Sequence, residues 1–193
     1  MFSPIIGFIF KLCGWKVVGH VDPNMPKAMW VLAPHWSNWD VFLGIGVRPI
    51  VRLRIGFLAK SELFHWYSSW LIRAVGGYPV DRKNASNLVD AVANMFKKSE
   101  SMHISITPEG TRSDVSTIKS GFYYMALKAN VPILLCGFEY PTKSLIFSEP
   151  IYPTGNYAQD MKPLYDFFLT VKGPKKKWLL DYERTGIVPE SRK

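Results

Sequence analysis

The amino-acid sequence predicts a single α/β domain, with a central, mostly parallel β-sheet flanked by helices and preceded by an apolar N-terminal helix. The length of 193 residues is that of one ordinary domain. Hydrophobic residues make up 48% of the chain and charged residues 20%, which supplies a full core and excludes a disordered polar protein. Short apolar runs alternate with helical patterns along the chain, and this alternation is typical of the α/β class.

Short apolar runs bounded by loop residues predict the strands. The runs MWVLA, IGFLA and ILLCGF are too short for stable helices, and they are rich in the residues that strands favour. We expect strands at 29–33, 55–59, 103–106 and 133–138, with shorter ones at 78–80 and 144–147. A further lead-in strand is expected between the N-terminal helix and residue 28.

Apolar residues at three- and four-residue spacing predict the helices. Leu88, Val92 and Phe96 follow this spacing and place apolar side chains on one face of a helix. We expect helices over residues 2–13, 38–47, 61–75, 86–99, 120–129 and 161–171. Asn130 is a suitable residue to end the fifth of these, and Pro163 is placed in the first turn of the last, where proline is tolerated.

Three segments follow from these elements. Residues 1–28 hold the apolar helix and the lead-in strand, residues 29–172 form the main domain, and residues 173–193 form a basic tail that we expect to be loose. The chain has two cysteines far apart in sequence, Cys13 and Cys136, which excludes a disulfide scaffold and a CxxC site, and each lies in an apolar run. We expect both to be buried thiols in a reducing compartment.

The composition favours an anionic partner. Lys and Arg number 24 against 15 Asp and Glu, a net charge of +9, which suits nucleic acid, anionic lipid or a phosphate-bearing substrate. Aromatic residues reach 15%, including seven Trp, and together with the charge they suit a membrane surface. Nucleic acid is not expected as a partner, because the basic residues are dispersed and no nucleic-acid-binding motif is present.

The N-terminal segment favours a peripheral location. Residues 1–10 are apolar, but they lack the basic region and cleavage site of a signal peptide. Lys11 and Lys16 interrupt the apolar run before the about 20 residues that a membrane span needs. We therefore expect a protein at the cytoplasmic face of a membrane, with neither a signal peptide nor a full transmembrane span.

A histidine and an aspartate five residues apart follow the first strand of the main domain. If a helix starts at Ser37 or Asn38, His35 lies in the loop before it and Asp40 lies in its first turn. Asp40 can then accept the His35 Nδ1–H and leave Nε2 as a general base. The alternative is a capped helix with a surface histidine beside its capping aspartate.

A second polar segment, Thr107–Ser113 (TPEGTRS), follows another predicted strand. Gly110 allows close approach of a ligand to the backbone, and Thr111 offers a hydroxyl group. Arg112 offers a planar set of donors suited to phosphate or carboxylate. The alternative is an ordinary loop in which Glu109 and Arg112 form a solvated ion pair.

These two segments together resemble the motifs of the glycerolipid acyltransferase family, the group that contains the lysophosphatidic acid (1-acyl-sn-glycerol-3-phosphate) acyltransferases. That family carries H-x-x-x-x-D (HX4D) followed by F-P-E-G-T-R-S, and here Glu109 follows His35 by 74 positions, a separation typical of the family. Further blocks also match, namely KSEL at 60–63, GGYPVDR at 76–82 and VPI at 131–133. The sequence departs from the pattern where Thr107 replaces Phe, Pro79 replaces an aromatic residue and Leu135 replaces Pro, changes that concern the acceptor pocket.

The resemblance implies transfer of a fatty acyl group from a thioester to a lipid hydroxyl. His35 would be the general base and Asp40 would orient its ring. Lys60, with nearby backbone amides, would stabilise the oxyanion, or it would be a plain surface cation. The donor would be acyl-CoA or acyl-ACP, with acyl carrier protein as a partner in the second case, and the reaction would need no metal or other cofactor.

The resemblance also implies an acceptor that carries a phosphate. Arg82 and Arg112, with Gly110 and Thr111, would hold that phosphate. Glu109 would either bind an acceptor hydroxyl or only position Arg112. The lysophospholipid 1-acylglycerol-3-phosphate is the acceptor we expect. A lyso-aminolipid is the alternative within the same fold, and a non-catalytic lipid-binding or nucleic-acid-binding protein is the alternative of a different class.

Three segments are candidates for contact with an anionic membrane surface. They are the apolar N-terminal helix with Lys11 and Lys16, the aromatic stretch Leu63–Leu71 (LFHWYSSWL), and the cluster Lys175–Trp178. Each basic residue near such a surface contributes ~1 kcal/mol to the free energy of membrane binding. The alternatives are an N-terminal helix that belongs to the core and a lysine run that only keeps the tail soluble.

Overall fold

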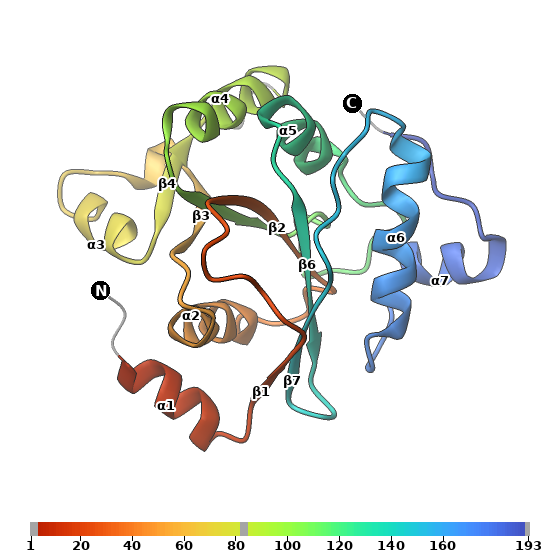
Figure 1. Cartoon of the computed structure of the whole chain (residues 1–193), viewed down its shortest axis with the longest axis horizontal. Coiled ribbons are helices and arrows are strands. Elements are labelled where there is room, and N and C mark those ends of the chain that lie inside the picture. Colours follow the sequence, from red (N-terminus) through yellow and green to blue (C-terminus); the bar gives the residue numbers. More distant parts are fainter. Residues whose placement is uncertain (1–3, 82–84, 192–193) are drawn as a thin grey trace.

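A computed structural model describes residues 4–81 and 85–191 and arranges them as a seven-stranded sheet between two groups of helices (Figure 1). The strands are β1 Lys16–Val18, β2 Lys27–Ala33, β3 Ile55–Lys60, β4 Gly77–Val80, β5 Met102–Ile106, β6 Ile133–Glu139 and β7 Ser144–Phe147. The helices are α1 Pro4–Leu12, α2 Trp39–Val51, α3 Ser69–Ala74, α4 Ala85–Lys98, α5 Gly121–Ala129, α6 Tyr157–Thr170 and α7 Lys177–Thr185, with a 3-10 turn, η1, at Ser61–Leu63.

The sheet is mostly parallel, as the alternation of strands and helices predicts. Its strand order is β1-β7-β6-β2-β5-β3-β4, and β6 and β7 form the antiparallel pair. The remaining neighbours, including β2 with both β5 and β6, pair in parallel. The α/β class, the central sheet and the apolar N-terminal helix are therefore confirmed.

Strand β2 shows how the sequence builds a core on both faces of the sheet. Successive side chains of a strand point to opposite faces. Met29 and Val31 pack with α4, α5, α6 and α7 in one cluster, whereas Trp30 packs with α1 and α2 in the other. Figure 1 shows the same division, with α1 and α2 on one side of the sheet and α4 and α5 on the other.

The sheet brings the two polar segments of the sequence to one edge. β2 ends at Ala33 and its parallel neighbour β5 ends at Ile106, so the loops that carry His35 and Thr107 leave the same side of the sheet. Ligands of open α/β sheets bind at this edge, outside the carboxyl ends of the strands. The fold therefore places the His35–Asp40 and Thr107–Ser113 segments beside each other.

Two helices differ from the prediction. The single helix expected over 61–75 is wrong, because η1 is followed by a turn before α3. Ser68 Oγ donates to the Leu63 carbonyl oxygen at 2.7 Å, a side-chain bond that competes with the helical backbone pattern. Helix α6 begins at Tyr157 with its N-cap at Asn156, so Pro163 lies inside the helix and not in its first turn.

The described part of the C-terminal segment contains helix α7, Lys177–Thr185, which corrects the prediction of a loose tail from residue 173 onward. Helix α7 packs Trp178 and Leu179 into the core, with neither side chain accessible to solvent. The three consecutive lysines before Trp178 obscure the short apolar pattern of this helix in the sequence. Cys136 is buried as expected, but Cys13 is exposed, which corrects the prediction for that residue.

Candidate active site

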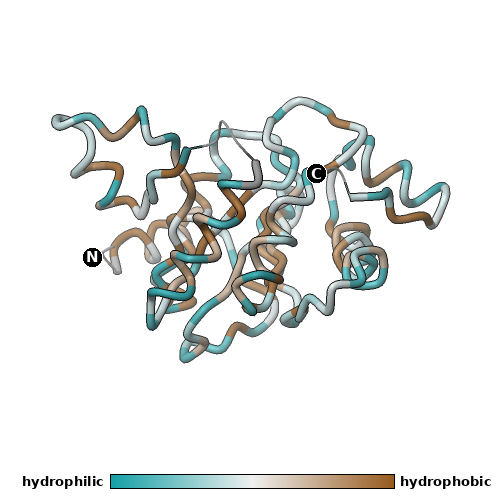
Figure 2. The backbone as a smooth tube through the Cα atoms, turned by 90° about the horizontal axis from the view of Figure 1, so that it is seen from above, coloured by the Kyte–Doolittle hydropathy of each residue, from teal (hydrophilic) through white to brown (hydrophobic). Residues whose placement is uncertain are grey.

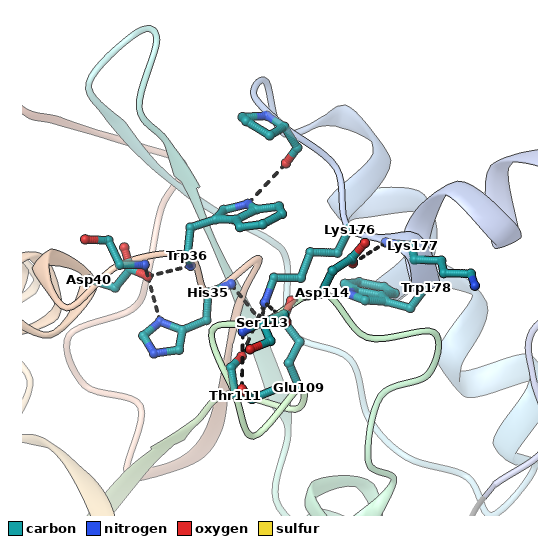
Figure 3. Close-up of polar contacts among 12 residues, drawn as sticks. His35, Trp36, Asp40, Glu109, Thr111, Ser113, Asp114, Lys176, Lys177 and Trp178 are labelled. Atoms are coloured by element: carbon teal, nitrogen blue, oxygen red, sulfur yellow. Dashed lines mark hydrogen bonds and ion pairs between the residues drawn. The ribbon is translucent and has the colours of Figure 1, made fainter.

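The structure brings His35 and Asp40 together (Figure 3). His35 lies in the loop after β2 and Asp40 in the first turn of α2, and His35 Nδ1 lies 2.6 Å from Asp40 Oδ2. An ionised carboxylate only accepts hydrogen bonds, so Nδ1 carries the hydrogen and Nε2 is left with a free lone pair. Asn38 is the N-cap residue of α2, as the spacing predicts, although its side chain makes no capping bond.

The carboxylate of Asp40 is held in its ionised form. Its side chain is only 3% exposed, and burial alone would raise the pKa. Hydrogen bonds from His35, from the Tyr140 hydroxyl and from the Ser37 amide outweigh burial and lower the pKa of Asp40 below its ordinary value. The Trp36 amide also donates to Oδ2, at 3.1 Å. Asp40 is therefore a fixed acceptor for the His35 ring near neutral pH.

Tyr140 belongs to the site although the sequence reasoning did not single it out. It follows β6, the other parallel neighbour of β2, and its hydroxyl donates to Asp40 Oδ1. Burial and the negative charge of Asp40 raise the pKa of Tyr140, so the hydroxyl stays protonated as a donor. Its position directly after a buried strand, like that of His35 after β2, is the signal in the sequence that could have found it.

Glu109 has a place that neither of its two predicted roles described. The side chain is fully buried, and Oε2 accepts from the backbone N–H of His35 at 2.8 Å. The same oxygen lies 2.9 Å from Lys176 Nζ, and Oε1 accepts from the Trp178 indole at 3.1 Å. Glu109 therefore ties the His35 loop to the C-terminal segment.

Residues 110–113, which follow Glu109 in this loop, are exposed. Arg112 reaches across to the first loop and donates to Asn38 Oδ1 at 2.5 Å, so the two loops are joined at a second point. Gly110 has a φ of +67°, a left-handed conformation that favours glycine. Thr111 Oγ1 accepts from the Ser113 amide, and the Thr111 carbonyl accepts from Lys176. Gly110 and Thr111 line a cavity beside this loop, whereas Arg112 is held against Asn38.

Two adjoining cavities open at these loops. The smaller, of about 400 Å³, is lined by His35, Asp40 and apolar side chains of α2 and the sheet. The larger, of about 1470 Å³, lies between α4, α5 and the loop after β5 and is mainly apolar. Thr107, Gly110 and Lys119 line both cavities, which places them where the two spaces meet.

The structure does not bring Lys60 to these cavities. Lys60 ends β3 with an exposed side chain, and it is not among the described residues that line either space. Lys119, which the sequence reasoning did not single out, lines both of them instead. Arg82, the other predicted phosphate ligand, lies outside the described residues.

The described residues hold no group of three or more His, Cys, Asp or Glu side chains that could bind a metal ion. Within the same part of the chain, no helix combines the length and the apolar character that crossing a bilayer requires.

Comparisons with known proteins agree on one family. A family model described as Acyltransferase matches residues 17–139. A 1-acyl-sn-glycerol-3-phosphate acyltransferase of Streptococcus pneumoniae is 29% identical over 163 residues, which cover 78% of this chain and 60% of that protein. The human 1-acyl-sn-glycerol-3-phosphate acyltransferase beta is 28% identical over 156 residues, covering 70% of this chain and 55% of that one. The chain thus spans somewhat more than half the length of these two relatives.

A solved structure supports the fold. The crystal structure of the 1-acyl-sn-glycerophosphate (LPA) acyltransferase PlsC from Thermotoga maritima superimposes with a TM-score of 0.54 at 23% identity. The superposition covers 94% of this chain and 78% of that one, so it includes nearly every element described above. With the family model matching well over half of the sequence, the chain belongs to the acyltransferase family.

Proposed function

We propose that the protein transfers a fatty acyl group from an acyl thioester to the free hydroxyl of 1-acyl-sn-glycerol-3-phosphate, with His35 as the general base. The observation that carries this proposal is the contact of His35 Nδ1 with Asp40, which leaves Nε2 available beside a cavity bordered by cationic side chains. The names of the two curated relatives support the same acceptor.

The reaction is a direct acyl transfer. The acceptor hydroxyl oxygen attacks the thioester carbonyl carbon, and His35 Nε2 takes the hydroxyl proton as the new C–O bond forms. The tetrahedral intermediate carries an oxyanion that nearby donors stabilise. It collapses by breaking the C–S bond, and the imidazolium returns the proton to the leaving thiolate. The products are an ester and a free thiol, and Asp40 stabilises the imidazolium in between.

The cavities provide room for both ends of the acceptor and for an acyl chain. Lys119 is an exposed cation that lines both cavities, and Arg112 is an exposed cation of the neighbouring loop that reaches Asn38, so we expect a phosphate group to bind between them. The mainly apolar lining of the larger cavity suits a hydrocarbon chain. The proposal assigns the phosphate to Arg112 and Lys119, joined by Arg82 as expected from the sequence.

The test is turnover of a thioester by the His35→Gln variant. Acyl-CoA and acyl-ACP are each supplied with 1-acylglycerol-3-phosphate, and thiol release is followed. We expect turnover to fall by about 10³-fold, because the acceptor hydroxyl loses its base. His20→Gln, which alters an exposed histidine outside the site, is the matched control and keeps its activity. Undiminished turnover by His35→Gln would overturn the assignment of the base.

The acceptor is tested separately. An acceptor without phosphate should be a poor substrate, because Arg112 and Lys119 would lose their ligand. Equal turnover of a lyso-aminolipid would instead favour the alternative acceptor.

The substrate class leads to a second part of the proposal, peripheral binding to an anionic membrane. Acceptor and product are lipids, so the site must open near a bilayer. Trp66 is 91% exposed and Trp70 is 68% exposed in the segment after β3, which leaves the sheet at the same edge as His35. Side chains of this kind favour the boundary between water and lipid.

A further inference from the structure

Lys176 is a buried cation at the centre of the contacts between the two active-site loops and the C-terminal segment (Figure 3). It occupies the N-cap position of α7, and its side chain is 0% exposed. Nζ donates to Glu109 Oε2 at 2.9 Å, to the Ser113 carbonyl at 3.1 Å and to the Thr111 carbonyl at 3.3 Å. All three hydrogens of the ammonium group are therefore used.

Lys176 is connected to His35 through a single oxygen atom. Glu109 Oε2, which binds Lys176 Nζ, also accepts from the backbone N–H of His35 at 2.8 Å. The same ammonium lies 4.9 Å from the centre of the Trp36 ring, within the range of a cation–π contact. Lys176 is therefore linked to the backbone N–H of His35 through Glu109, and it contacts the ring of Trp36, the next residue, directly.

Neighbouring contacts fix the C-terminal segment in this position. The Trp36 indole donates to the Pro174 carbonyl, and the Lys177 amide donates to Asp114. The Trp178 amide donates to the Val115 carbonyl at 3.0 Å, and its ring nitrogen donates to Glu109. The segment thus joins the loop after β2 to the loop after β5.

We propose that Lys176 is a positioning residue for acyl transfer, which keeps the His35 ring in contact with Asp40 by holding the Glu109 carboxylate against the His35 backbone. The inference rests on the proposed role of His35 as base. A carboxylate buried without its cation would move toward water or take up a proton. A displaced carboxylate loses the His35 N–H, and a protonated one accepts it more weakly, so the backbone from which the His35 ring reaches Asp40 is held less firmly.

The first measurement needs no turnover. In protein labelled with 15N at histidine, side-chain nitrogen shifts report the tautomer, and the His35 signals are those lost in His35→Gln. We expect His35 of the native chain to be the Nδ1–H tautomer, and Lys176→Met to give a mixture of tautomers. An unchanged tautomer in folded Lys176→Met overturns the proposal. The tautomer is measured without turnover, so this experiment tests the positioning role of Lys176 separately from the catalytic role of His35.

The second measurement is kinetic. We expect Lys176→Met to lower kcat by about 100-fold, the loss that a small misplacement of a catalytic group causes, while KM for the acceptor changes little. Lys177→Met removes the adjacent, exposed lysine and keeps the backbone bond to Asp114, so it should match the native chain. A rise in KM with unchanged kcat would mean that Lys176 acts on binding, and would overturn the positioning role.

A double variant keeps the test decisive if Lys176→Met folds poorly. Lys176→Met combined with Glu109→Gln removes both buried charges, so no unpaired ion remains. If Lys176 acts through Glu109, adding Lys176→Met to Glu109→Gln should lower kcat much less than adding it to the native chain. Losses that multiply independently would show that Lys176 does not act through Glu109.

Discussion

The carboxylate of Asp40 accepts hydrogen bonds from two parts of the chain that are distant in sequence. His35 and the Trp36 and Ser37 amides come from the loop after β2, and Tyr140 comes from the end of β6. Each donor favours the ionised carboxylate, and together they outweigh the effect of burial on its pKa. The orientation of the His35 ring is therefore fixed by the fold before any substrate binds.

Substitutions of Lys119 and Lys60 test which of these two lysines binds the phosphate of the acceptor. We expect Lys119→Met to raise KM for 1-acylglycerol-3-phosphate about tenfold, because a charge-assisted hydrogen bond to phosphate is lost. Lys60→Met should have the smaller effect, since its exposed side chain lies outside both cavities. Steady-state kinetics of the two variants decide the comparison. Lys97→Met, on the exposed face of α4, controls for the loss of one positive charge.

A larger rise in KM for Lys60→Met than for Lys119→Met would contradict the assignment of the phosphate to Lys119.

The sequence could predict the two loops of the site but not what lies between them. Strand context and spacing make His35, Asp40 and Glu109 candidates, and the resemblance to the acyltransferase motifs singles them out. Lys176 could not be found in this way, because a lysine within a run of three lysines normally indicates a solvated surface. Only the tertiary contact with Glu109 reveals that one of the three is buried.

At the scale of elements, Asp160 joins α6 to its neighbours. Its carboxylate accepts from the Tyr123 hydroxyl of α5 and from the amides of Thr154 and Gly155. We expect Asp160→Asn to lower the free energy of unfolding by about 1–3 kcal/mol near pH 7, because buried donors lose a charged acceptor. Urea unfolding measures this difference. Asp90→Asn, which breaks an exposed ion pair with Lys128, should lower the free energy of unfolding by less than about 1 kcal/mol.

The effect of Asp160→Asn should depend on pH in a definite direction. Burial would raise the pKa of Asp160, but its hydrogen bonds outweigh burial and lower the pKa below the ordinary value of 3.8. The unfolded chain therefore binds this proton first, so the stabilisation is complete above that value and is lost as pH falls through the lower, folded pKa. A difference between native and variant chains that grew on acidification would contradict this assignment.

The elements that were mispredicted share a physical cause. The stretch 61–75 has enough apolar residues for a helix, yet the Ser68 side chain takes the Leu63 carbonyl and interrupts it. Helix α7 has too few apolar residues for its pattern to stand out, and its stability comes from burial of Trp178. Strands such as β2 were predicted well because burial on both faces leaves a continuous apolar run.

At the scale of the whole molecule, exposed apolar side chains gather at one end. In Figure 1 this end carries α1, α2 and α3, and Figure 2 shows hydrophobic segments of the chain beside the N-terminus there. We call it the docking face and define it by its exposed residues, which are Ile5, Phe8, Ile9, Leu12, Trp39, Val41, Phe42, Leu63, Trp66, Tyr67, Trp70 and Leu71. Lys11 and Arg73 are exposed on the same helices. An apolar face edged by cations suits an anionic bilayer.

Removing two tryptophans from the docking face should weaken membrane binding. We expect the double variant Trp66→Ser/Trp70→Ser to bind anionic phospholipid vesicles roughly 10- to 100-fold less tightly, because the apolar area of two large side chains no longer enters the lipid. Flotation of the full chain with vesicles over a lipid titration measures the affinity. Added salt should weaken binding of the native chain further, since it screens the attraction of the cations to the anionic surface.

The matched control for this experiment is Tyr152→Ser. Tyr152 is 67% exposed and follows Ile151, which pairs with Ile133 at the amino end of β6, so it lies at the edge of the sheet opposite His35. A bilayer that contacts the docking face does not reach that edge, and flotation should not change. Equal flotation of all three chains would exclude the segment after β3 as the membrane contact. Weakening by Tyr152→Ser alone would move the contact to the other edge, where the site could not receive a lipid from the bilayer.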